Sequence, residues 1–153
     1  MSDGATGGPA RWPVVAGLAG VATLAQLWGL YRVAGPPAPP WFPHADKLEH
    51  AVGFALPVAL LLVALGLRAA ELGRAPSRRP TVAVVGSFAA HAVVSELVQH
   101  AFYTSRTGDP FDVLADLVGV AAGALLAWVA LRRRAGGRAT STSRPGQSGA
   151  VAR

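Results

Sequence analysis

Polar side chains with the capacity for acid–base chemistry lie inside or beside long apolar runs of this sequence. Glu96 and Asp116 are surrounded by apolar residues, and Asp112 opens the last of the apolar runs. A carboxyl group held away from water can exchange a proton near neutral pH, and histidine does so by its intrinsic chemistry. We therefore take Glu96, Asp112, Asp116 and His50 as the candidate catalytic residues.

A second group of polar residues is suited to binding a substrate rather than to reacting with it. Lys47 and Arg106 are cations that can hold a phosphate or a carboxylate, and Asp46 and Gln99 offer hydrogen-bonding groups beside them. We expect these residues to act together with the acids only if the fold brings them to one level. The substrate-binding candidates are Asp46, Lys47, Gln99 and Arg106.

The elements that carry these residues are predicted to be membrane-spanning helices. Hydrophobic residues make up 52% of the chain and charged residues only 14%, whereas soluble domains carry roughly 25% charged residues. Each apolar run is close to the ~20 residues that cross a bilayer. The predicted helices are residues 13–31, 48–67, 81–103 and 112–131. The sequence thus predicts an all-α, polytopic membrane protein with a four-transmembrane-helix bundle.

Helical periodicity places the polar residues of three helices on stripes that could face one another. The stripes hold Asp46 and His50 on the second helix, Glu96 and Gln99 on the third, and Asp112 and Asp116 on the fourth. We expect these six to meet in one layer near one end of the bundle. Gly119 and Gly123 continue the last stripe, and glycines spaced in this way usually allow helices to pack closely. We assign them to helix packing.

The flanks of the helices predict the domain limits and the orientation. We expect residues 1–11 to be a disordered tail, 12–134 the membrane domain, and 135–153 a disordered basic tail. Most arginines fall in the two tails and in the segment between the second and third helices, which by the positive-inside rule faces the cytoplasm. We expect a multi-pass protein of the cell membrane with both termini cytoplasmic. The first helix is too long for a typical signal peptide.

Several classes of function are disfavoured by composition and spacing. The net charge of +6 comes from arginines beside apolar runs without interleaved aromatic residues, which argues against nucleic-acid binding. A metal site built from His50, Glu96, Asp112 and Asp116 lacks the His-Glu-x-x-His spacing of many zinc enzymes. We therefore predict no metal and no cofactor. The expected partner is the lipid bilayer, and the oligomeric state is left open.

The order of these residues resembles the VanZ-like family of integral membrane proteins. The resemblance covers roughly residues 44–131 and rests on Asp46-Lys47-x-x-His50, Glu96-x-x-Gln99, Arg106, Asp112, Asp116, Gly119 and Gly123. It implies an all-helical protein of the cell envelope. The member that names the family is linked to resistance to the glycopeptide teicoplanin, without a settled molecular activity. Lipid-linked envelope precursors are the partners that the resemblance suggests.

Two hypotheses of different kinds follow from the sequence. In the first, an outward-facing polar site binds or modifies a lipid-linked envelope component, with an effect on glycopeptide sensitivity. In the second, the polar layer is a structural ion network and the protein is a non-enzymatic scaffold or regulator. No nucleophile motif, P-loop or dinucleotide fingerprint is present to decide between an enzyme and a scaffold.

Overall fold

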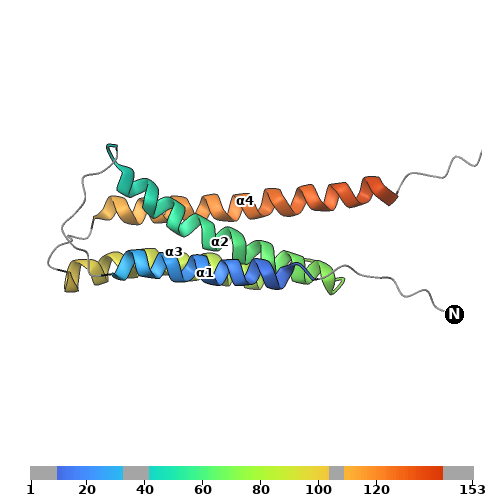
Figure 1. Cartoon of the computed structure of the whole chain (residues 1–153), viewed down its shortest axis with the longest axis horizontal. Helices are drawn as coiled ribbons and strands as arrows, with labels where there is room; N and C mark the ends of the chain where they lie inside the picture. The colour runs from blue at the N-terminus through green and yellow to red at the C-terminus, as the bar shows by residue number, and fades with distance from the viewer. Residues whose placement is uncertain (1–9, 33–41, 104–108, 143–153) are drawn as a thin grey trace, which may run out of the picture.

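Four helices make up the part of the chain that the computed structural model describes, which is residues 10–32, 42–103 and 109–142, with side chains to residue 137. They are α1 (Trp12–Tyr31), α2 (Ala45–Glu71), α3 (Arg78–Phe102) and α4 (Pro110–Thr142), and these described ranges contain no strand. Each helix is long and apolar enough to span a membrane. The predicted all-α bundle of four membrane-spanning helices is therefore confirmed, and Figure 1 shows its elongated shape.

The helices begin and end within four residues of the predicted limits, except at the end of α4. α2 begins at Ala45 instead of residue 48, where Asp46 in its first turn interacts favourably with the helix dipole. α4 continues to Thr142, through residues 135–142 that we expected to belong to the tail. The segment contains no proline that would interrupt the backbone hydrogen bonds, and the extension of an existing helix needs no new nucleus. The rest of both predicted tails, residues 1–9 and 143–153, lies outside the described residues.

α2 is the central helix of the bundle and contacts each of the other three. In Figure 1 it crosses obliquely between α4 and the pair formed by α1 and α3. The contact between α2 and α4 is a backbone contact. A Cβ atom placed on Gly119 would lie under 3.0 Å from the backbone of Ala51, and one on Gly123 would meet Ala55 in the same way. Small residues thus allow the two helices to touch directly.

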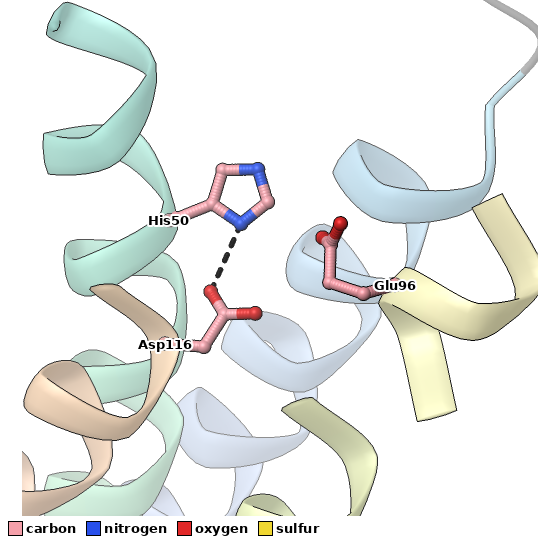
Figure 2. Close-up of side chains that lie close together, drawn as sticks. All are labelled: His50, Glu96 and Asp116. Atoms are coloured by element: carbon pink, nitrogen blue, oxygen red, sulfur yellow. Dashed lines mark hydrogen bonds and ion pairs between the residues drawn. The ribbon is translucent and has the colours of Figure 1, made fainter. Parts of the chain in front are cut away.

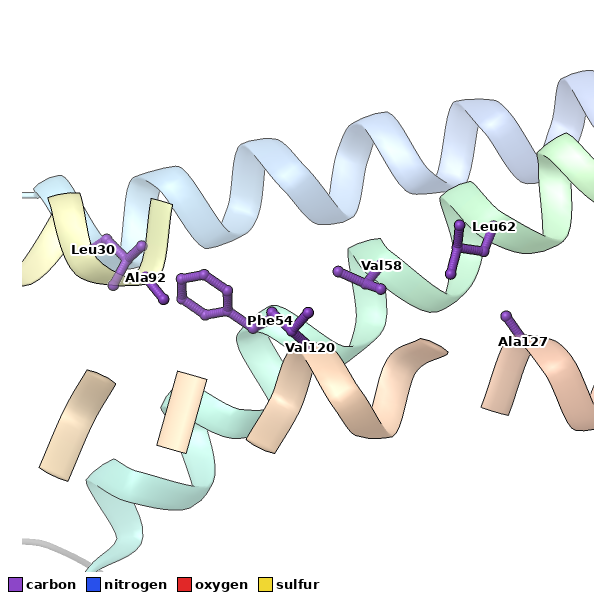
Figure 3. Packing of buried hydrophobic residues seen from close by; sticks show 7 residues of the cluster. All are labelled: Leu30, Phe54, Val58, Leu62, Ala92, Val120 and Ala127. Carbon is purple, nitrogen blue, oxygen red and sulfur yellow. The ribbon is translucent and has the colours of Figure 1, made fainter. Parts of the chain in front are cut away.

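The apolar core of the bundle lies around α2. Phe54 and Val58 are almost completely buried, and Phe54 meets the ring of Phe88 edge to face with 6.3 Å between centroids. Figure 3 shows the buried cluster, which consists of Leu30, Phe54, Val58, Leu62, Ala92, Val120 and Ala127. Many other large apolar side chains face outward, among them Leu24 and Val82, each 68% exposed. Such an outward apolar surface is suited to lipid contact.

The end of α1 is attached to α3 by two side chains. The amide of Gln99 donates to the carbonyl of Leu30 at 3.0 Å, and the hydroxyl of Tyr103 donates to the carbonyl of Tyr31 at 2.6 Å. Carbonyls in the last turn of a helix have no partner within the helix. The two bonds satisfy the carbonyls of Leu30 and Tyr31. They also hold α1 against α3 at the level where the polar residues gather.

Candidate functional site

A hydrogen bond between α2 and α4 forms the centre of the candidate site. Nδ1 of His50 lies 2.9 Å from Oδ1 of Asp116, whose side chain is completely buried. His50 directly precedes Ala51, and Asp116 lies one turn before Gly119, so the close backbone contact of the two helices brings the pair together. Figure 2 shows the imidazole directly above the carboxylate.

Glu96 reaches the same place from α3. Its side chain is only 5% exposed, and its Oε2 accepts a hydrogen bond from the backbone N–H of Asp109 at 3.1 Å. The ligand atoms of His50, Glu96 and Asp116 all lie within 4.8 Å of one another. Figure 2 shows the three side chains close together, on three different helices. We call these three residues the acid–histidine site. Among the described residues, Oε1 of Glu96 and Oδ2 of Asp116 are buried without any hydrogen-bond partner.

A second group of charges surrounds Lys47 at the beginning of α2. Its Nζ lies 2.5 Å from Asp112, 2.6 Å from Asp109 and 3.1 Å from Asp46. We call these four residues the Lys47 cluster. The Lys47 ammonium holds the pKa of the Asp109 carboxyl below its usual value, and the Phe111 N–H adds to this effect. The cluster connects the beginning of α2 to the beginning of α4.

The predicted single layer of six residues is therefore divided into separate groups. His50, Glu96 and Asp116 meet in the acid–histidine site, whereas Asp46 and Asp112 turn to Lys47. Asp46 remains at the edge, with its side chain 59% exposed.

The substrate-binding candidates are also distributed differently from the prediction. Gln99 uses its amide to hold the end of α1, so its described contact is structural. Lys47 is surrounded by three carboxylates, which neutralise the charge that we assigned to an anionic substrate. Arg106 lies outside the described residues. Asp109 was missed because it lies before α4, where helical periodicity gives no information about its direction.

Close to the acid–histidine site, a cavity of about 550 Å³ lies between α1 and α2. Most of its wall is apolar, and His50 forms part of it. The other polar side chains in its wall are Gln26, Arg32 and Glu49. Gln26 is 7% exposed, and neither atom of its amide has a hydrogen-bond partner in the described part of the chain. We call this cavity the α1–α2 groove.

Comparison with known proteins gives no match to a family model, to a curated protein or to a solved structure. The resemblance to the VanZ-like family stays a prediction that rests on the residues named above. The function has to be argued from the site itself.

Proposed function

We propose that this protein is a VanZ-like protein of the cell envelope that binds a lipid-linked component with an anionic headgroup in the α1–α2 groove. The observation that carries the proposal is the position of His50, which belongs both to the acid–histidine site and to the wall of the groove. A lipid lying in the groove would therefore reach the reactive residues directly from the bilayer. The proposal places this end of the bundle on the outer side of the membrane.

The wall of the groove has the chemistry that such a lipid needs. Its inner stretch is formed by small and apolar residues, among them Ala22, Leu56 and Pro57, which suit a hydrocarbon chain. Arg32 lies at the end of α1 and makes no salt bridge within the described residues, so its guanidinium is available for a phosphate. The unpaired amide of Gln26 supplies a further hydrogen-bonding group.

The acid–histidine site supports a chemical step on the bound lipid. Asp116 accepts a hydrogen bond at Nδ1 of His50 and so orients the imidazole. The remaining ring nitrogen, Nε2, is the atom that can take up a proton from a hydroxyl or a water molecule. Glu96, at the other side of the site, is placed to return a proton.

Binding is tested with one pair of lipids and one pair of variants. The protein is placed in phosphatidylcholine nanodiscs and titrated with a polyprenyl phosphate, and with the polyprenol of the same chain length. We expect the polyprenyl phosphate to bind more tightly than the polyprenol. Arg32→Gln should lower the ratio of the two affinities by about tenfold. Arg68→Gln, at the far end of α2, is the control and should leave it unchanged. Equal binding of both lipids by the unaltered protein would refute the proposal.

The consequence in cells is tested by glycopeptide sensitivity. We expect His50→Asn and Glu96→Gln variants that insert normally to lose any effect of the protein on growth in teicoplanin. Exposed His100 on α3 provides the matched control, as His100→Asn should keep the effect. Variants of the acid–histidine site that behave as the unaltered protein would remove its assigned role.

The alternative function is a scaffold in which the charges only hold the helices. The Lys47 cluster favours it, because three carboxylates from two parts of the chain share a single ammonium group. A scaffold predicts that Lys47→Met and His50→Asn lower stability in parallel and leave lipid binding unchanged. The lipid-binding proposal predicts that His50→Asn changes lipid binding or turnover. Lys47→Met should not change them, even where the two variants are equally stable.

A further inference from the structure

The acid–histidine site contains more negative charge than its described partners neutralise. Glu96 and Asp116 are both more than nine-tenths buried, and one oxygen of each has no hydrogen-bond partner among the described residues. Lys47, the cationic side chain of the neighbouring cluster within the described ranges, is already surrounded by three other carboxylates. Unpaired carboxylates inside a membrane protein are costly to keep. Their two free oxygens, both at the place that His50 faces, indicate a missing positive partner.

We propose that His50, Glu96 and Asp116 bind one divalent transition-metal ion. With a neutral imidazole, two carboxylates balance a dication, so the site as a whole carries no net charge. The ion would also be a positive partner for the two carboxylates, each of which has one oxygen without a hydrogen-bond partner in the described part of the chain. This inference does not depend on a lipid in the α1–α2 groove. A bound ion would replace the proton shared by Nδ1 of His50 and Asp116, and it would make Glu96 a ligand instead of a proton donor. The inference differs from the sequence-based prediction, which rejected a metal only because the His-Glu-x-x-His spacing is absent.

The geometry is compatible with such an ion. Nδ1 of His50 and Oδ1 of Asp116 are 2.9 Å apart, which is about the spacing of neighbouring ligands around a metal with bonds of about 2.1 Å. The Glu96 carboxylate lies within 4.8 Å of both and comes closer by rotation of its side chain. The Asp109 N–H donates a hydrogen bond to Oε2 of Glu96 and so orients the carboxylate. Metal ligands are commonly oriented by hydrogen bonds of this kind.

The donor set limits the identity of the metal. One imidazole nitrogen with two carboxylate oxygens suits Zn²⁺ or Mn²⁺, and it lacks the thiolates that select copper(I) or iron–sulfur clusters. Three protein ligands leave further coordination positions open for water or another ligand. His50 also lines the groove, so an open position of the ion could face it.

The experiment measures metal binding directly in the full-length protein, purified through a tag without histidine and treated with EDTA. We expect calorimetry to give one equivalent of bound Zn²⁺ or Mn²⁺ per chain. Bound Co²⁺ should give an absorption band, and this band should disappear when Zn²⁺ or Mn²⁺ displaces the Co²⁺. Glu96→Gln, Asp116→Asn and His50→Gln should each weaken binding by at least about tenfold. Glu71→Gln and His100→Gln remove an exposed acid and an exposed histidine on the same helices, α2 and α3, and they should bind as the unaltered protein does.

Thermal unfolding separates loss of the site from loss of the fold. A ligand that binds only the folded state raises the melting temperature. We expect Zn²⁺ or Mn²⁺ to do so for the unaltered protein and for both control variants, but not for the three site variants at the same metal concentration. The proposal is wrong if the unaltered protein binds none of the three ions stoichiometrically, or if the site variants bind and respond as the controls do. Neither result depends on whether a lipid binds, so this test and that of the proposed function can fail separately.

Discussion

The two ends of the bundle use charge in opposite ways. At the polar end, where α2 and α4 begin, acidic side chains meet Lys47 and His50 across helices. At the arginine end, where α2 finishes, the cations lie over aromatic rings and are exposed. The guanidinium of Arg68 lies 5.2 Å from the ring centre of Trp12, and that of Arg132 lies 4.1 Å from that of Trp128. Charges at the first end hold helices together, whereas those at the second face outward.

This difference indicates which end carries the specific site. Exposed arginines beside tryptophans are typical of an interface with lipid headgroups, where position matters more than exact geometry. A cavity of about 550 Å³ at the arginine end, lined by Arg68, Arg74 and Arg132 among apolar residues, suits any anionic headgroup. Buried charges that pair between helices need defined positions. The polar end should therefore tolerate substitution much less than the arginine end.

The largest contrast is expected from removing one nitrogen-containing side chain at each end. His50→Leu leaves the completely buried Asp116 without its hydrogen-bond partner, and we expect the free energy of unfolding to fall by about 3–5 kcal/mol. Arg68→Leu should change it by at most about 1 kcal/mol, because Arg68 is exposed and loses one cation–π contact with Trp12. Denaturation in mixed micelles with EDTA measures both. Combining His50→Leu with Asp116→Leu should recover part of the loss, and additive losses would contradict the assigned pairing.

Glycine substitutions test the same contrast through packing. A methyl group on Gly119 meets the backbone of Ala51, which cannot move aside, so we expect Gly119→Ala to destabilise the protein by about 1–3 kcal/mol. At the arginine end, Gly66→Ala meets only the flexible side chain of Leu131. Its cost should stay below about 1 kcal/mol, partly offset by the better helix propensity of alanine. Equal effects of the two variants in thermal unfolding would show that the α2–α4 contact is not rigid.

A smaller effect is expected at the Lys47 cluster. Lys47→Met keeps the aliphatic stem and removes the charge that three carboxylates share, so we expect a loss of roughly 1–2 kcal/mol, between the values for exposed and buried pairs. Arg132→Met removes one cation–π contact at the exposed end, which contributes about 0.5–1 kcal/mol. Denaturation in the same micelles should show a larger loss of stability for Lys47→Met than for Arg132→Met. The reverse order would contradict the view that the polar end depends more on its charges than the arginine end does.

The smallest effect is a change in acid stability. The pKa of Asp109 is lowered from 3.8 by Lys47, so its contribution to stability is complete above pH 3.8. It is then lost as the pH falls further, through the lower pKa of the folded state. Asp109→Asn should remove this part of the pH dependence. Melting temperatures of the two proteins should change in parallel above pH 3.8 and converge below it, and a constant difference at all pH values would contradict the ion pair.

Hydropathy predicted the helices because a bilayer requires ~20 apolar residues for each crossing, and this signal depends on no tertiary contact. Periodicity also predicted that His50, Glu96 and Asp116 lie on stripes that could converge, and the structure brings them together. Periodicity could not predict which acids would pair with Lys47. That pairing depends on the side-chain positions of residues outside helices, such as Asp109. Nor does a sequence show that Gln99 would bind a backbone carbonyl of α1, since every residue carries one.

The pairing of α2 with α4 has a consequence for the synthesis of the protein. His50 and Asp116 are 66 residues apart in the chain. Chains grow at roughly 5–20 residues per second, so roughly 3–13 seconds pass between the translation of the two. During that interval the carboxylates of Asp109, Asp112 and Asp116 have not yet been translated, and Asp46 is the one acid of the Lys47 cluster that already exists. The hydrogen bond between His50 and Asp116 and the close contact of α2 with α4 therefore form only after α4 has been translated.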